Sequence, residues 1–164
     1  MIYIILFVSL LLDYVFLSLI SNNSLLFPLF TLVSLILIYP LFKEHQFNRY
    51  LIISFCLGIV YDVVYMNTIF LNIGSFLLFP YLIKYFFKNF SVNIINNILI
   101  TILLIIIYRT ITFLVLSLAG YLSLNFWLWI KGIYSSLIVN ILYVIVIYYT
   151  SLFIGSKFEI RRFR

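Results

Sequence analysis

Residues 94–118 read IINNILITILLIIIYRTITFLVLSL. This stretch contains a single charged side chain, that of Arg109. The hydrocarbon core of a bilayer is about 30 Å thick, and roughly 20 consecutive apolar residues cross it as an α-helix. The stretch is therefore predicted to be a membrane-spanning helix, and it decides the class to which the protein belongs.

Similar apolar runs lie on both sides of this stretch and are separated by short polar breaks. They predict further spans at residues 2–20, 25–42, 49–66, 69–86 and 132–154, followed by a basic tail at 155–164. The prediction is an all-α integral membrane protein with one transmembrane domain, residues 1–164, built as a bundle of six helices.

The overall composition supports this class. Hydrophobic residues make up 66% of the chain, and the mean hydropathy is +1.28. Charged residues make up 9%, whereas soluble domains contain about 25%. The net charge of +6 is carried mostly by the predicted loops and tail, which indicates contact with membrane lipids and not with nucleic acid.

Lysine and arginine are distributed unevenly among the predicted connections. The second-to-third connection, the fourth-to-fifth connection and the tail contain Lys43, Arg49, Lys84, Lys88, Lys157, Arg161, Arg162 and Arg164. With six spans these regions lie on one side of the membrane, and basic residues favour the cytoplasmic side. Both termini are therefore predicted to be cytoplasmic, and Trp127 and Trp129 to lie at the outer interface, where indole rings are favoured.

Three ionisable residues, Asp13, Asp62 and Arg109, lie inside predicted spans. A charge at the bilayer centre costs about 2.5–3.5 kcal/mol even on lenient insertion scales. At 1.5 Å per residue, the three lie roughly 17, 19 and 22 Å from the inner ends of their helices. We therefore expect an intramembrane charged cluster, in which Arg109 bridges the two carboxylates or Lys131 neutralises one of them.

Such a cluster has more than one interpretation. It can fix the packing of the helices, it can bind a small cation or relay protons, or it can face lipid or a partner protein. The sequence shows no transport pathway, so a structural or partner-binding role is favoured.

Small and polar side chains recur at helical spacing in the later spans. The third span places Ser54, Gly58, Tyr61, Asp62 and Tyr65 on one face, and the fifth places Asn97, Thr101, Tyr108, Arg109 and Thr112 on one face. Such side chains allow helices to approach closely and to form hydrogen bonds in lipid. The residues predicted to pack helices together are Gly58, Gly74, Gly132, Ser136 and Asn140.

No pattern in the sequence is typical of catalysis or of metal binding. Cys56 is the one cysteine and is predicted to be a buried apolar residue, and His45 is predicted to be a solvated loop residue. No nucleophile lies beside a base, and no phosphate-binding loop or H-E-x-x-H helix is present. We therefore expect no catalytic site, no cofactor and no metal.

Residues Gly58 to Asp62 have the form G-x-x-x-D, and Asn72, Ile73 and Gly74 open the next apolar run after a short turn. This segment resembles MreD, a family of membrane subunits of the bacterial rod-shape machinery. The predicted termini and the acid in the third span are also similar to that family. The resemblance covers the whole chain in hydropathy and about residues 58–81 in motif.

The resemblance implies a non-enzymatic scaffold in the bacterial cytoplasmic membrane. Such a scaffold associates with an MreC-like protein and, through it, with the RodA glycosyltransferase, a class B penicillin-binding protein and MreB. It supports cell shape and lateral peptidoglycan synthesis during elongation.

Two other functions compete with the scaffold. The MreD fold is similar to that of the substrate-binding subunits of energy-coupling-factor vitamin transporters. Those subunits usually have an A-x-x-x-A face on the first helix, which this chain lacks. A membrane-embedded aspartyl protease is the third possibility, but neither Asp13 nor Asp62 lies in a G-x-G-D sequence.

Overall fold

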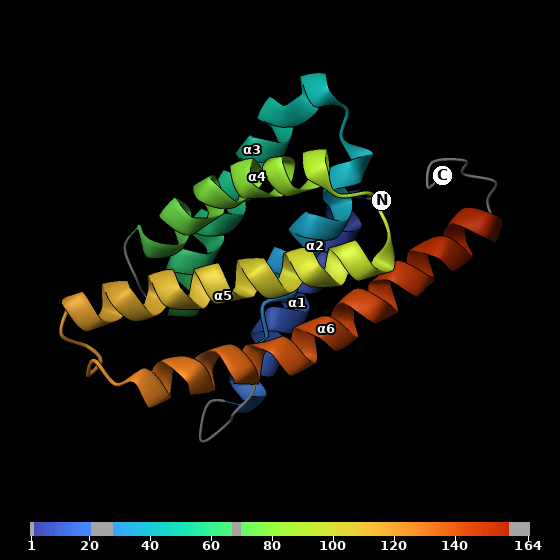
Figure 1. The fold of residues 1–164 in the computed structure, drawn as a ribbon. Coiled ribbons are helices and arrows are strands. Elements are labelled where there is room, and N and C mark those ends of the chain that lie inside the picture. Colours follow the sequence, from blue (N-terminus) through green and yellow to red (C-terminus); the bar gives the residue numbers. More distant parts are fainter. Residues whose placement is uncertain (1, 21–27, 67–69, 158–164) are drawn as a thin grey trace.

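The structure is a computed structural model that describes residues 2–20, 28–66 and 70–157. Within these ranges every regular element is helical, so the predicted all-α class is confirmed. In chain order the elements are α1 (Ile2–Ile20), α2 (Phe30–Ile38), η1 (Tyr39–Leu41), η2 (Glu44–Gln46), α3 (Phe47–Val60), η3 (Tyr61–Met66), α4 (Leu71–Asn89), α5 (Ile94–Leu118) and α6 (Phe126–Lys157) (Figure 1).

Several helix boundaries coincide with the predicted spans, and others differ for a physical reason. Helices α1 and α5 have the predicted limits. Helix α6 begins at Phe126, well before the predicted residue 132, because Asn125 caps it: Asn125 Oδ1 accepts a hydrogen bond from the backbone N–H of Trp127 at 2.9 Å. Lys131 therefore lies within a helix and not in a loop.

The second predicted span, residues 25–42, is longer than the helix described there. Residues 21–27 lie outside the described ranges, and Leu29 is not helical (φ −139°, ψ 46°). The α-helical part begins at Phe30, and with η1 it extends only to Leu41. At 1.5–2.0 Å per residue this segment measures about 20 Å, less than the thickness of the hydrocarbon core.

Three helical stretches in the described ranges are long and apolar enough to cross a membrane. They are Glu44–Val64, Ile94–Leu118 and Phe126–Thr150. Ile2–Ser18 and Phe30–Leu41 are shorter apolar helices. These lengths and compositions are those of a membrane protein.

Consecutive helices pair with each other. The most extensive contacts join α1 to α2, α3 to α4 and α5 to α6, and in Figure 1 α5 and α6 lie side by side as a long hairpin. Helix α2 also contacts α5 and α6. Nearly all of α2, from Phe30 to Ile38, is buried, as expected for a helix that is apolar on every face. This short, enclosed helix is the centre of the structure.

Candidate functional site

The N-terminus of α2 is buried and is capped by side chains of other helices. Both carboxylate oxygens of Asp13, on α1, accept hydrogen bonds from it: Oδ1 from the backbone N–H of Phe30 at 2.8 Å and Oδ2 from that of Thr31 at 2.9 Å. The preceding N–H, of Leu29, donates to Oδ1 of Asn140 on α6 at 2.9 Å. Three amides that have no partner inside α2 are thereby satisfied.

Helix α4 is capped in the same way by the second aspartate. Oδ1 of Asp62, on η3, accepts hydrogen bonds from the backbone N–H and from Nδ2 of Asn72, each at 3.0 Å. Oδ2 accepts from the backbone N–H of Ile73 at 3.0 Å. Phe70, just before the helix, adopts a left-handed conformation (φ 69°), which turns the chain into this position.

The two capped hairpins, α1–α2 and α3–α4, therefore share one device. In each, an aspartate, Asp13 within α1 or Asp62 in η3 directly after α3, accepts hydrogen bonds from the first free amides of the second helix. A carboxylate at a helix N-terminus also interacts favourably with the helix dipole, by up to about 2 kcal/mol in partly buried geometries. These caps could not be read from the sequence, because each aspartate lies between 10 and 18 residues from the amides that it binds.

Two tyrosines connect the capped hairpins to each other and to α5. The hydroxyl of Tyr61, next to Asp62, donates to Oδ2 of Asp13. The hydroxyl of Tyr108, on α5, donates to Oδ1 of Asn72 at 2.7 Å. Both tyrosines are almost completely buried. The hydrogen bonds around Asp13 and those around Asp62 meet at the adjacent residues Tyr61 and Asp62, and together these two groups form a polar network that joins α1, α2, η3, α4 and α5.

Arg109 extends the network to α6. Its Nε donates to Oγ of Ser136 at 2.7 Å, and Ser136 Oγ is also within 3.1 Å of the carbonyl oxygen of Gly132. Asn140 donates from Nδ2 to the Ser136 carbonyl oxygen at 2.6 Å. The described hydrogen bonds thus place Arg109 on the α6 side of the network, beside Tyr108, and Lys131 is exposed on the first turns of α6.

The predicted packing residues fall into two groups. A Cβ atom on Gly58 would lie 2.9 Å from Cα of Ile73, so Gly58 allows α3 and α4 to meet at their backbones. Ser136 and Asn140 are buried and bond as described above. Gly74 and Gly132 were predicted to pack as well, but a Cβ on either would meet no atom of the described residues within 4 Å. Among the described residues, these two glycines therefore do not make the close backbone contact that Gly58 makes.

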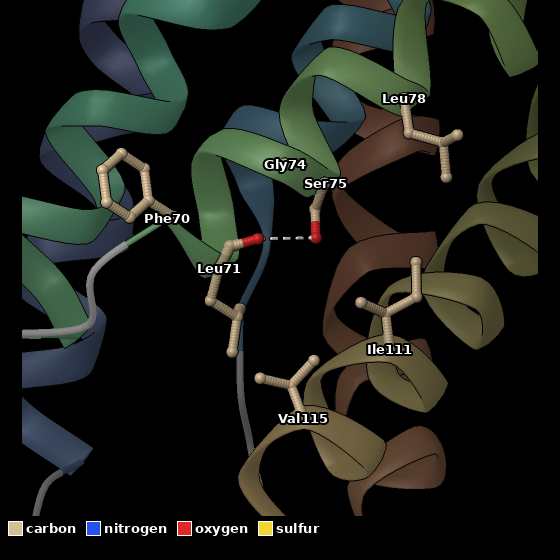
Figure 2. Close-up of a pocket in the computed structure, with 7 residues that line it drawn as sticks. All are labelled: Phe70, Leu71, Gly74, Ser75, Leu78, Ile111 and Val115. Carbon is tan, nitrogen blue, oxygen red and sulfur yellow. Dashed lines mark hydrogen bonds between the residues drawn. The ribbon is translucent and has the colours of Figure 1, made fainter. Parts of the chain in front are cut away.

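Gly74 lies instead beside a groove between α4 and α5 (Figure 2). The groove has a volume of about 440 Å³ and is lined by Phe70, Leu71, Gly74, Ser75, Leu78, Ile111 and Val115. The one hydroxyl in it, that of Ser75, donates to the carbonyl oxygen of Leu71 at 3.0 Å. The groove therefore offers an apolar surface and no free polar group for recognition.

The polar side chains of this site mainly hold the helices together. Within the described ranges no group of three or more His, Cys, Asp or Glu side chains could hold a metal ion. Cys56, predicted to be buried, is exposed on α3, because its face of the helix points away from α4. His45 lies in η2, as part of the polar connection. The carboxylates of Asp13 and Asp62 are bound by amides that would otherwise be unsatisfied.

Comparisons with known proteins give no further assignment. No family model, no curated protein and no solved structure matches the chain.

Proposed function

We propose that this protein is a non-enzymatic scaffold subunit of the bacterial cell-elongation complex, with six spans and both termini in the cytoplasm. In this proposal it resides in the bacterial cytoplasmic membrane, binds an MreC-like partner and supports lateral peptidoglycan synthesis with RodA, a class B penicillin-binding protein and MreB. The resemblance of residues 58–81 to MreD suggests the complex, and the geometry of the same residues supports a binding role.

The observation that carries the proposal is the groove beside Gly74. The segment with the family-like motif builds it: Gly58 brings α3 against α4, Asp62 caps α4, and Gly74 then leaves space at the α4 surface. In lipid, close helix association depends on small residues that let backbones approach. A bulky apolar helix of the partner, packed between α4 and α5, would fill this space.

The hydrogen bonds made by the two aspartates also favour a scaffold over a hydrolase. A catalytic acid or base needs an oxygen that reaches the reacting group. All four carboxylate oxygens of Asp13 and Asp62 instead accept hydrogen bonds from the first amides of α2 and α4. Using either acid in catalysis would release a helix end.

The proposal is tested by isolating the protein from native membranes with its partners. The tagged wild-type chain should recover an MreC-like protein. Gly74→Leu, which fills the groove, should lose that partner while the variant remains folded. Gly132→Leu is the matched control, since it adds the same side chain at another open glycine.

Two results would contradict parts of the proposal. Recovery of the wild-type chain without any elongation protein would reject the assignment to the complex. Equal recovery of the partner with Gly74→Leu and Gly132→Leu would keep the assignment but reject the groove as the contact.

A further inference from the structure

The tip of the α5–α6 hairpin, residues 118–128, is the most exposed apolar part of the described chain. Every residue in it is exposed, and Leu118, Tyr121 and Leu124 have 85%, 80% and 78% of their surface accessible. The sequence contains no lysine, arginine, aspartate or glutamate between Arg109 and Lys131. Large apolar side chains without any charge are unfavourable in water, at about 25 cal/mol for each Å² left uncovered.

The backbone of the tip is closed by two local motifs. At the end of α5, Gly120 adopts a left-handed conformation with φ +79°. Its N–H donates to the carbonyl oxygen of Ser117 at 3.1 Å, and the N–H of Tyr121 donates to the carbonyl oxygen of Leu116 at 2.9 Å. This is a Schellman motif, which satisfies the last carbonyls of a helix. At the start of α6, Asn125 supplies the cap described above. The helix ends at the tip therefore need less water to satisfy their polar groups.

The position of the tip relative to a bilayer follows from its neighbours. The tip joins Ile94–Leu118 to Phe126–Thr150 (Figure 1), and both of these helices are long enough to cross the hydrocarbon core. The tip therefore lies where the two helices emerge from the hydrocarbon core. Lys131 is exposed, and a lysine charge avoids the hydrocarbon centre. Lys131 lies five positions after Phe126 along α6, a rise of about 7.5 Å, which is comparable to the headgroup layer on one side of a bilayer.

We propose that the tip is a lipid-binding surface that inserts into the glycerol and headgroup layer of the leaflet it meets. Tyrosine and tryptophan favour this layer, which accommodates an apolar ring with one polar atom. Three features of the tip favour contact with lipid. It has no charged side chain, its helix ends are capped, and it continues directly into two helices long enough to span the membrane. The function proposed above is not needed for this inference.

The two tryptophans then have different roles. Trp127 is 69% exposed and belongs to the lipid-binding surface. Trp129 is partly buried, and its Nε1 donates to Oγ1 of Thr110 at 3.1 Å, so it joins α6 to α5. Since the chain contains only 2 tryptophans, each can be observed alone after one substitution.

The experiment uses the full chain reconstituted in phosphatidylcholine vesicles. In Trp129→Phe the emission comes from Trp127, and in the control Trp127→Phe it comes from Trp129. Quenching is compared for lipids brominated near the glycerol end of the acyl chains, for lipids brominated near the chain terminus, and for aqueous iodide. Circular dichroism in the same vesicles establishes that each variant is helical.

The expected result is that Trp127 is quenched most by shallow bromine, less by deep bromine and least by iodide, with emission at shorter wavelength than in water. Trp129 should respond less to every quencher, because it is packed between helices. Strong iodide quenching of Trp127 with no bromine quenching would overturn the proposal and would instead indicate a surface for an extramembrane protein. The same deep-bromine preference for both tryptophans would also overturn it, since the tip would then lie in the hydrocarbon.

Discussion

Asp62 and Asn72 are joined twice, because the backbone N–H and the side-chain Nδ2 of Asn72 both donate to the same carboxylate oxygen at 3.0 Å. This pair fixes the start of α4 against η3. The remaining amide acceptor of Asn72 is bound by the Tyr108 hydroxyl, so one side chain couples η3, α4 and α5. The first prediction concerns that coupling.

Asp62→Asn and Tyr108→Phe should destabilise the protein by about 1–3 kcal/mol each, because each leaves a buried polar group without its partner. Since both act through Asn72, their effects should be non-additive, with a coupling energy of about 0.5–3 kcal/mol. Unfolding in mixed detergent gives the stability of the four proteins of this double-mutant cycle, which are the wild type, the two single variants and the double variant. Tyr81→Phe, at an exposed tyrosine on α4, is the control and should change little. Strict additivity would show that Asn72 does not transmit the coupling.

Asp13→Asn should destabilise the centre of the bundle by about 1–3 kcal/mol. An amide replaces one carboxylate oxygen by an NH₂ group, which would face the backbone N–H of Phe30 or Thr31 or the Tyr61 hydroxyl, all of which act as donors here. Hydrogen exchange of the amides of Phe30 and Thr31 should also become faster. Ser18→Ala, at an exposed position on α1, is the control. Unchanged exchange at these two amides would argue against the cap.

Gly58→Ala should cost about 1–3 kcal/mol, because the new Cβ would lie 2.9 Å from the backbone of Ile73 and would force α3 and α4 apart. Gly74→Ala should instead be neutral or stabilise the protein by about 0.4–1 kcal/mol, since no described atom obstructs it and alanine favours the helix. Thermal unfolding of the two variants in one detergent compares them directly. An equal loss of stability would contradict the different surroundings of the two glycines.

Ser136→Ala and Ser135→Ala should destabilise the protein to different extents although the two residues are adjacent. Both hydroxyls lie near the carbonyl oxygen of Gly132, but only that of Ser136 accepts the described hydrogen bond from Arg109 Nε. Ser136→Ala should therefore cost about 1.5–3 kcal/mol, the range for a hydrogen bond to a charged group, and Ser135→Ala should cost less. Denaturant unfolding of the two variants provides the measurement. A larger loss for Ser135→Ala would place the anchor of Arg109 elsewhere.

The predicted orientation can be measured independently of function. Cytoplasmic termini are predicted from the basic residues at the second-to-third connection, at the fourth-to-fifth connection and in the tail. A reporter that fluoresces only in the cytoplasm should be active when fused to either terminus. It should be inactive when inserted at Gly120, in the connection between α5 and α6. Activity at Gly120 and inactivity at the termini would invert the topology.

The sequence was most informative where one property repeats along a helix. The limits of α1 and α5 follow from uninterrupted apolar runs, and the close approach at Gly58 follows from a small residue on a polar face. The predicted start of the sixth span at residue 132 differs from the start of α6 at Phe126, because the local cap at Asn125 begins the helix. Asp13, Asp62 and Arg109 stand out in the sequence because a charged side chain is costly in lipid, which is a property of each residue alone.

The sequence by itself therefore determined that this chain is helical, apolar and suited to a membrane, and which few polar side chains require an explanation. Only the tertiary structure decided what those side chains do. A carboxylate in lipid must find donors, but several donors would satisfy it equally, and the sequence does not rank them. The fold brings the amides of Phe30 and Asn72, 17 and 10 residues further along the chain, against Asp13 and Asp62, because the first amides of a helix that begins inside the bundle have no partner within that helix.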